Sequence, residues 1–199
     1  MPKNVRVYLW LLLALLGGGI ALAALSLPRL NRAREAGGYP RCGSNLRQLG
    51  QALTLYAQAN AGRLPETLED LLRADLDLTP HVFLCPSSND EVMPGLSSTQ
   101  PSADEMVARI RERGMPTSLS DPPPPTTRPR YFSYIYAASG RTIDQITPRT
   151  VLVYEPLSNH DGDGAHVLFG DGDAEWLNRD AAIKLLAPSA APTTSAPTR

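Results

Sequence analysis

An uncharged apolar run near the N-terminus constrains this chain more than any other feature. Residues 7–27 read VYLWLLLALLGGGIALAALSL, which is 21 residues without a charged side chain. A helix needs about 20 such residues to cross the hydrocarbon core of a bilayer. Basic residues flank the run on both sides, so the positive-inside rule gives no clear orientation. We expect residues 1–28 to be a membrane anchor that contacts the lipid bilayer through residues 7–27.

A cleaved signal peptide is the alternative interpretation of the same segment. Its basic lead would be residues 3–6, its apolar core residues 7–16, and its small-residue cleavage site residues 21–23. The full length of the run favours a retained anchor. Under either interpretation the rest of the chain leaves the cytoplasm.

Charge balance and cysteine content narrow the possible partners. The 199 residues carry 19 Lys and Arg against 20 Asp and Glu. A net charge of -1 argues against a nucleic-acid partner, because phosphate binding needs a clustered basic surface. Cys42 and Cys85 are the two cysteines, and in an exported chain we expect them to form a disulfide. Two buried free thiols are the alternative.

Hydrophobic periodicity predicts helices first and strands later along the chain. Residues 44–61 have an amphipathic helical pattern, with Ser44 as the expected N-cap and Gly62 as the expected C-terminal stop. A short helix follows Pro65, with Thr67 and Asp70 in a capping arrangement. The apolar face of the first helix is expected to contain Leu46, Leu49, Leu53, Tyr56 and Asn60.

Residues 86–130 are rich in Pro and Ser, and we expect them to form an excursion from the domain rather than part of its core. One helix is expected within them, capped by Ser102 and ended by Gly114. The prolines at 122–125 predict an exposed polyproline II segment.

Strand patterns then occupy 131–136, 150–154, 166–169 and 174–177. The sequence Asp171-Gly172 predicts a type I′ hairpin turn between the last two strands. A final helix would begin at Asp180 and turn Ile183, Leu185 and Leu186 inward.

This order predicts an α+β fold, with an amphipathic helix on a small antiparallel sheet of three or four strands. The expected organisation is an anchor at 1–28, a juxtamembrane linker at 29–43, a globular head at 44–186 and a disordered tail at 187–199. The tail is too poor in bulky apolar residues to fold.

The densest polar cluster lies at 159–173, around the last hairpin. Hard oxygen ligands on a glycine-rich loop suit Ca²⁺. The candidate calcium ligands are Asp161, Asp163, Asp171 and Asp173. The competing interpretation is that these residues only make turns, because Asp and Asn bond their own backbone and Gly adopts left-handed conformations.

Enzyme motifs are not found in the sequence. A metalloenzyme site at His160 and His166 is disfavoured, because the two histidines are not a helical His-x-x-x-His pair and no general base stands out. The sequence contains no Gly-x-Ser-x-Gly elbow and no phosphate-binding glycine loop. We therefore expect a non-enzymatic protein, and Ca²⁺ is the one cofactor for which the sequence offers candidate ligands.

Three segments resemble those of type II secretion pseudopilins and related prepilin-like proteins. Residues 42–65, from CGSNLRQLGQALTLY to NAGRLP, are similar to the segment that follows the membrane helix in that family. Residues 83–86, FLCP, resemble the Cys-Pro of its variants with paired cysteines, and residues 165–172, AHVLFGDG, resemble the C-terminal hairpin of the subfamily marked by His, nine residues, then Asp-Gly.

This resemblance implies a pilin-like α+β head on a single-pass anchor in the inner membrane, with the head outside the cytoplasm. It implies a role in type II secretion or surface assembly, with other pseudopilins or secretion-system proteins as partners. The alternative is an envelope binding module, dependent on Ca²⁺, that kept the pilin-like head and does not polymerise.

The chain departs from the family pattern in two places. Ten residues, not nine, separate His160 from Asp171. The prepilin-peptidase signature Gly-Phe-Thr-Leu-x-Glu is absent, and no acidic residue precedes Glu35. In the family, that signature glutamate pairs with the N-terminus of a neighbouring subunit. The resemblance therefore does not extend to processing by the prepilin peptidase or to filament assembly.

Our first prediction is that residues 7–27 stay attached, with the N-terminus in the cytoplasm and residues 42–199 outside. The short basic lead favours this orientation, whereas Arg29, Arg32 and Arg34 oppose it. N-terminal sequencing should find no mature chain that starts near Ala24. Protease added to intact spheroplasts should digest the head, and a fully protected head would contradict the orientation.

Overall fold

The computed structural model describes residues 15–17, 19, 40–74, 76, 78–93 and 102–186. Most of the predicted anchor at 7–27 and the predicted tail at 187–199 lie outside these residues; positions 15–17 and 19 are helical. The chain divides into two compact units, Met1–Gly38 and Tyr39–Arg199. Within the described part of the chain, no helix combines the length and the apolar character needed to cross a membrane.

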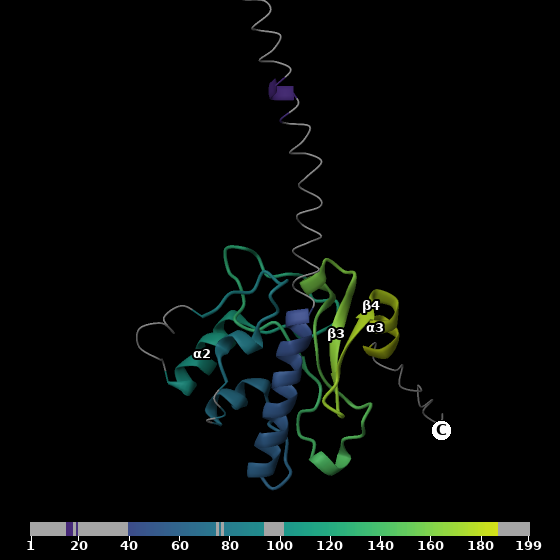
Figure 1. The fold of residues 1–199 in the computed structure, drawn as a ribbon. Helices are drawn as coiled ribbons and strands as arrows, with labels where there is room; N and C mark the ends of the chain where they lie inside the picture. Colours follow the sequence, from purple (N-terminus) through teal and green to yellow (C-terminus); the bar gives the residue numbers. More distant parts are fainter. Residues whose placement is uncertain are drawn as a thin grey trace, which may run out of the picture. The chain divides into compact units, whose positions relative to one another are not determined.

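A helix over residues 40–59 is the first element of the second unit (Figure 1). Its buried positions recur every three or four residues, as an amphipathic helix requires. They include Cys42, Leu46, Leu49, Leu53 and Ala57. This confirms the predicted amphipathic helix, although it is already helical at residue 40.

The ends of that helix differ in detail from the prediction. Ser44 is exposed inside the helix and is not its N-cap. Asn60 is exposed too and donates its amide to the Tyr56 carbonyl, so it does not belong to the apolar face. The helix stops because Ala61 and Gly62 take positive φ angles of 55° and 80°. Cys42 is fully buried, so the predicted boundary between linker and head at residue 44 is too late.

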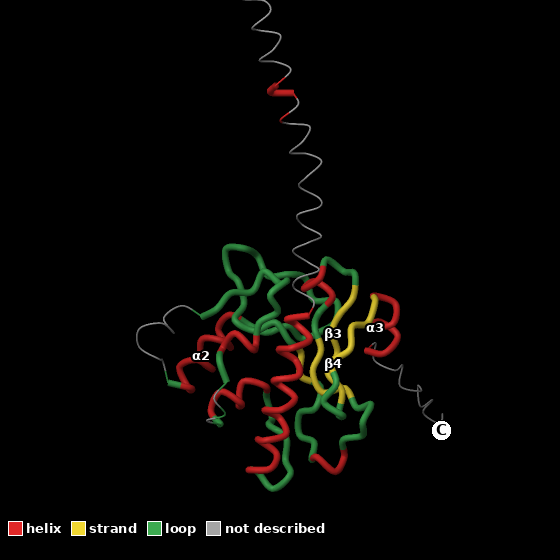
Figure 2. Tube along the Cα trace, in the orientation of Figure 1, coloured by secondary structure: helices red, strands yellow, loops and turns green. Residues whose placement is uncertain are grey.

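Four strands form one antiparallel sheet in the order β1-β2-β3-β4, which confirms the α+β class (Figure 2). Each strand pairs with the next along the chain. Their bounds are β1 Ile135–Tyr136, β2 Val151–Tyr154, β3 Gly164–Phe169 and β4 Ala174–Asn178.

The first strand is shorter than the predicted 131–136. The residues before it bond to the end of the short 3-10 helix η2 (Pro80–Phe83) instead of to β2. The Ser133 amide donates to the Phe83 carbonyl at 3.0 Å, and the Tyr134 hydroxyl donates to the Leu84 carbonyl, also at 3.0 Å. The aromatic and β-branched pattern therefore marked a buried segment, of which only the last two residues enter the sheet.

The strand β3 is buried along its whole length, between two layers of helix (Figure 1). On one face, the backbone of the 40–59 helix approaches closely where it has glycine: a Cβ at Gly50 would lie 3.2 Å from the Leu168 side chain. On the other face, Ala165 lies in an apolar cluster with Ala182 of α3. The sheet and the two helices thus form a three-layer head.

The last helix, α3, spans Arg179–Leu186 and buries Ala182. Of the residues predicted to face inward, Leu186 is partly buried and packs against the cluster that contains Ala182. Ile183 and Leu185 are largely exposed, which corrects the expected inward face. Its first turn is capped by the side chain of Asn178, which accepts a hydrogen bond from the Ala181 amide, and not by Asp180.

The hairpin between β3 and β4 exists, but its turn is not type I′. That turn needs positive φ at two consecutive residues. In the hairpin Gly172 has a φ of 85°, while Asp171 is not among the described non-glycine residues with positive φ. The amide of Gly172 donates to the Phe169 carbonyl, and the amide of Phe169 donates to the Asp173 carbonyl. The geometry is that of a type I turn followed by a left-handed glycine.

The segment 86–130 contributes to the core, which corrects its description as an excursion. Its helix α2, Ala103–Arg113, has the predicted Ser102 cap and ends at Gly114. Val107 and Ile110 of α2 are buried. The helix packs against η1, Leu68–Arg73, whose predicted Thr67–Asp70 capping box is present. The segment 122–125 is exposed apart from Pro124.

The second prediction tests the packing of the 40–59 helix. Leu49 is 0% exposed, and Leu49→Ala should lower the free energy of unfolding by about 2–5 kcal/mol, because it removes buried methyl groups and leaves a cavity. Leu55 on the same helix is 51% exposed, so Leu55→Ala should change stability by less than about 0.5 kcal/mol. Urea unfolding of both variants measures this. Equal losses would contradict the arrangement of the helix.

Candidate functional site

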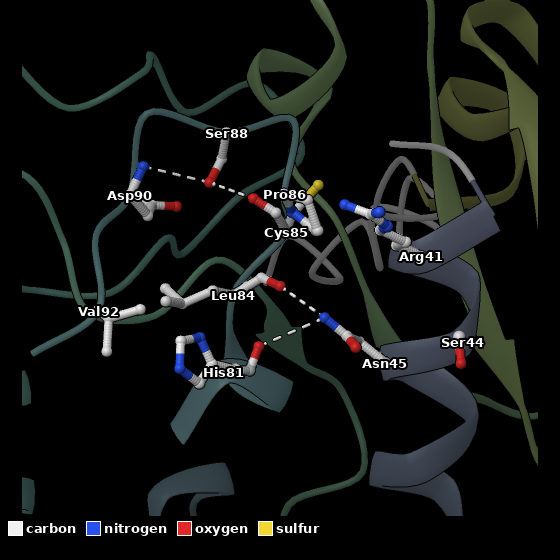
Figure 3. A pocket seen from close by; sticks show the side chains of 10 residues that line it. All are labelled: Arg41, Ser44, Asn45, His81, Leu84, Cys85, Pro86, Ser88, Asp90 and Val92. Atoms are coloured by element: carbon white, nitrogen blue, oxygen red, sulfur yellow. Dashed lines mark hydrogen bonds between the residues drawn. The ribbon is translucent and has the colours of Figure 1, made fainter. Parts of the chain in front are cut away.

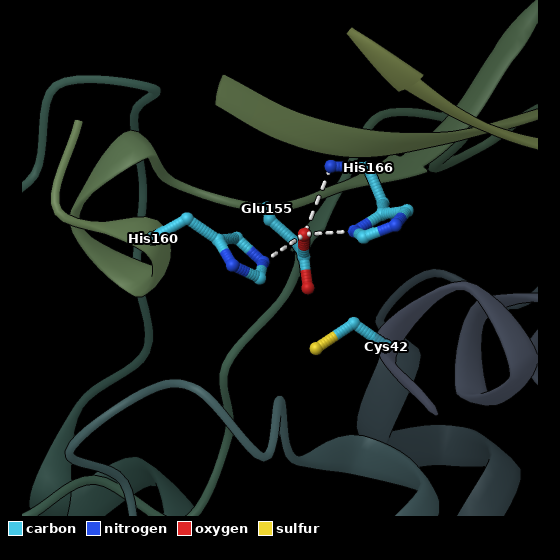
Figure 4. A group of neighbouring side chains, drawn as sticks. All are labelled: Cys42, Glu155, His160 and His166. Atoms are coloured by element: carbon cyan, nitrogen blue, oxygen red, sulfur yellow. Dashed lines mark hydrogen bonds and ion pairs between the residues drawn. The ribbon is translucent and has the colours of Figure 1, made fainter. Parts of the chain in front are cut away.

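Four polar side chains from separate segments meet inside the head (Figure 4). They are Cys42 of the first helix, Glu155 just after β2, His160 at the end of the short helix η4 (Leu157–His160), and His166 of β3. One potential ligand atom from each lies within 4.8 Å of every other, and all four residues are buried. We call these four residues the Cys-Glu-His cluster.

The connection between β2 and β3 places three of the four. The Glu155 amide donates to the His166 carbonyl, so the two residues lie opposite each other where the strands separate. The chain then turns back through Asp161 and Gly162, whose φ angles are 52° and 87°. The Gly162 amide bonds the Leu157 carbonyl at 2.9 Å. This tight turn directs His160 back toward Glu155.

The Glu155 carboxylate is the centre of the cluster. Its Oε2 lies 2.9 Å from His160 Nε2 and 2.9 Å from His166 Nδ1, and it accepts the backbone amide of His166 at 2.8 Å. The other oxygen, Oε1, is buried and accepts no hydrogen bond from the residues that the structure describes. Figure 4 shows that it points toward Cys42. One oxygen of the carboxylate therefore has three hydrogen-bond partners, and the other has none among the described residues.

The second cysteine lies at the edge of the same cluster. Cys85 Sγ is 3.6 Å from His160 Nε2, and the Cys42 sulfur lies within 4.8 Å of a ring nitrogen of the same histidine. Both cysteines are free and buried in the structure, so the predicted disulfide is not formed in it. The fold nevertheless brings both sulfurs to one histidine, and disulfide formation under oxidising conditions stays a prediction.

Mutual interactions decide the charge of the cluster. Burial opposes ionisation of Glu155, but its bonds with His160 and His166 outweigh this and lower its pKa to about 2. Burial likewise opposes protonation of His160, but Cys42 and Glu155 raise its pKa to about 9. The hydrogen bond from Cys85 lowers the pKa of Cys42 to about 7, although burial acts in the other direction. Burial raises the pKa of Cys85. Negative charge therefore concentrates on Glu155 and Cys42.

Trp176 covers the cluster from β4. It is paired with His166 across the sheet, and its ring lies edge-on to both histidine rings, with centroids 5.0 Å apart in each case. Gly164 permits this placement, because a Cβ there would lie 2.7 Å from Trp176 Cζ2 and 2.2 Å from the Leu177 carbonyl oxygen. An aromatic cover of this kind limits the access of water to the polar atoms beneath it.

The arrangement does not have the geometry of a nucleophilic triad. In such a triad the two ring nitrogens of the histidine serve different partners, the carboxylate and the nucleophile. Here the single atom His160 Nε2 lies next to Glu155 Oε2 at 2.9 Å and next to Cys85 Sγ at 3.6 Å. Cys42 is 0% exposed. Donor atoms that converge on one point, on residues closed to solvent, are typical of a ligand set rather than of a proton relay.

A surface groove borders the cluster at Cys85 (Figure 3). Its volume is about 380 Å³. Figure 3 shows Asn45 reaching across it, where the side-chain amide donates to the Leu84 carbonyl at 2.8 Å and the His81 carbonyl at 3.3 Å. These bonds tie the first helix to the segment that carries Cys85.

The four aspartates of the predicted calcium site do not come together. Asp161 and Asp163 precede β3, and Asp171 and Asp173 follow it. Six residues of strand separate the two pairs by about 20 Å. All four are exposed, and Asp171 uses a carboxylate oxygen to accept the Asp173 amide within the turn. The structure therefore gives no support to calcium at these residues, and their geometry is that of turn residues.

Sequence reasoning weighed His160 and His166 as metal ligands but missed their partners. Glu155 carried one usable signal: it directly follows the apolar strand 151–154, where a charged residue that becomes buried needs a partner. Cys42 carried no such signal, because it was assigned to the disulfide.

Comparison of the chain with protein-family models, curated proteins and solved structures finds no match.

The third prediction concerns the buried carboxylate. Glu155→Ala removes three contacts from the two histidines and should lower the free energy of unfolding by about 3–5 kcal/mol. Glu175 of β4 makes an exposed ion pair with Arg149 at 2.6 Å. Glu175→Ala is therefore the matched control and should cost at most about 1 kcal/mol. Chemical denaturation compares the two, and a Glu155→Ala loss as small as that of the control would contradict the central role of this carboxylate.

Proposed function

We propose that the chain is a non-enzymatic, membrane-anchored protein of the pseudopilin type that acts in type II secretion or surface assembly. Residues 7–27 hold it in the inner membrane, and the head faces away from the cytoplasm. Other pseudopilins or secretion-system proteins are its proposed partners.

One observation carries this proposal: the amphipathic helix of residues 40–59 packs its buried face across an antiparallel sheet. The resemblance of residues 42–65 and 165–172 implies a helix that continues from an anchor and a C-terminal hairpin. The head has a helix at residues 40–59 and a hairpin, β3–β4, at residues 164–178, and the hairpin packs next to the helix. The proposal therefore rests on a local sequence likeness and a compatible arrangement of elements.

A second function is favoured by a separate observation. The chain lacks an acidic residue before Glu35, and its head contains a buried cluster of metal-ligating residue types. Both features favour an envelope binding module that does not polymerise. This alternative keeps the anchor and the orientation but replaces assembly with binding.

The fourth prediction tests anchor and assembly together in the native host. Leu13→Arg with Leu16→Arg should release the chain from the membrane fraction or prevent its accumulation, because charges near the centre of a span are costly. Ala190→Arg with Ala191→Arg adds the same charge to the tail and should leave the chain in the membrane. An unchanged distribution in both variants would contradict the anchor.

Assembly is then read from the wild-type chain after mild detergent extraction. High-speed sedimentation with electron microscopy should show filaments or defined oligomers that contain the chain. A dispersed single-chain membrane protein would contradict the assembly role and support the binding module instead.

A further inference from the structure

We propose that the Cys-Glu-His cluster binds one divalent transition-metal ion, with Zn²⁺ as the best match. The ligands are Cys42, Glu155, His160 and His166. This inference does not depend on the anchor or on assembly, because it uses only side chains inside the head.

The donor types select the class of ion. One thiolate, two imidazoles and one carboxylate form a mixed sulfur, nitrogen and oxygen set, and Zn²⁺ binds all three donors in four-coordinate sites. Ca²⁺ and Mg²⁺ prefer oxygen ligands in larger number, so they do not fit. With both histidines neutral, the thiolate and the carboxylate together balance the double charge of the ion. A charge-neutral buried site avoids the cost of an uncompensated ion.

The distances are those of ligand atoms that nearly surround a metal. In a tetrahedral site with metal–nitrogen and metal–oxygen bonds of about 2.0–2.1 Å, neighbouring donor atoms lie about 3.3 Å apart. Glu155 Oε2 lies 2.9 Å from each histidine nitrogen that faces it, and all four donor atoms lie within 4.8 Å of one another. Shifts of roughly 0.5–1 Å suffice to convert these contacts into ligand bonds.

Glu155 supplies an independent indication that a cation belongs here. Its side chain is completely buried, yet Oε1 accepts no hydrogen bond from the described residues. Buried carboxylate oxygens are normally satisfied, and each exception needs an explanation. Oε1 points toward Cys42 (Figure 4), so a cation held by the four residues would also lie close to this unsatisfied oxygen.

The site would be structural rather than catalytic. Four protein ligands complete a tetrahedron and leave no open position for a substrate. Trp176 covers the histidines, and the ligands come from the first helix, the end of β2, η4 and β3. One ion would therefore join the helix to the sheet and would stabilise the native state by mass action.

Cys85 makes the site sensitive to oxidation. Its sulfur lies 3.6 Å from His160 Nε2, and the Cys42 sulfur lies within 4.8 Å of a ring nitrogen of the same histidine. A two-electron oxidant such as diamide would join the two sulfurs, with transfer of both thiol protons to diamide, which is reduced to its hydrazine. The resulting disulfide removes the Cys42 thiolate from the ligand set. Bound Zn²⁺ and the Cys42–Cys85 disulfide are consequently alternatives.

The fifth prediction is tested on the full-length chain, reduced, stripped with a chelator and then given Zn²⁺. We expect one Zn²⁺ per chain and a melting temperature raised by about 5–10 °C at a free zinc concentration about 100 times Kd. Co²⁺ should give the visible bands of a tetrahedral site and a thiolate-to-cobalt charge-transfer band. Ca²⁺ and Mg²⁺ should not change the melting temperature. Absence of zinc binding to the folded reduced chain would overturn the proposal and leave a metal-free hydrogen-bond network.

Variants locate the ion. Cys42→Ser should abolish the charge-transfer band and weaken zinc binding at least tenfold. Cys85→Ser removes the other sulfur and should retain the charge-transfer band and the zinc affinity. His81→Gln changes the one histidine outside the cluster and is the matched control. Retention of the band in folded Cys42→Ser, or its loss in His81→Gln, would overturn the assignment.

Two measurements on the wild-type chain cover the case in which Cys42→Ser does not fold. X-ray absorption of the zinc-loaded chain should show one sulfur and three lighter ligands, and a shell without sulfur would overturn the proposal. Diamide should link Cys42 to Cys85 in the zinc-free chain, read by mass spectrometry of non-reduced peptides, and Zn²⁺ should slow this reaction at least tenfold. Equal rates would count against Cys42 as a ligand.

Discussion

The head depends on the contact between the helix of residues 40–59 and strand β3. Gly50 lets the helix backbone approach the Leu168 side chain, and two turns earlier Gly43 faces the His166 ring, with a hypothetical Cβ 3.4 Å from its Cδ2. Small residues at this spacing face one side of a helix, so the backbone lies close to the sheet along its first turns. The apolar core forms around this contact, and Cys42 is placed beside His166 as a direct consequence.

This close approach also explains how a charged group is accommodated in the interior. Glu155 follows an apolar strand and is fully buried, which would be costly for a carboxylate without partners. His160 from the β2–β3 connection and His166 from β3 both contact its Oε2, and the 40–59 helix supplies the Cys42 thiol on its other side (Figure 4). Trp176 of β4 covers the cluster, and Gly164 of β3 leaves room for its ring. A buried carboxylate needs a partner for each of its oxygens. The unsatisfied Oε1 and the convergence of four donor atoms are the physical basis for proposing a cation here.

Local features of the chain were predictable because they depend on short-range physics. The period of the 40–59 helix, the Ser102 cap of α2, the Thr67–Asp70 box and the β3–β4 hairpin follow from residues a few positions apart. The misassignments have a shared cause. The exposure of Ile183, the burial of Val107 and Ile110 in a Pro-rich region, and the two-residue length of β1 depend on which surface packs against each segment, and propensity does not contain that information.

The sequence by itself determined the helix-then-sheet order, the α+β class and the candidate anchor, since hydrophobic period and uninterrupted apolar length are properties of neighbouring residues. It also pointed to His160 and His166, although it gave them no partner. Only the tertiary structure decided that the four aspartates lie at opposite ends of β3 and that Cys42, Glu155, His160 and His166 meet. The physical reason is that ligand atoms must lie within a few ångströms of one another. More than a hundred positions of chain separate Cys42 from the other three, and only the packing of the helix on β3 brings them together.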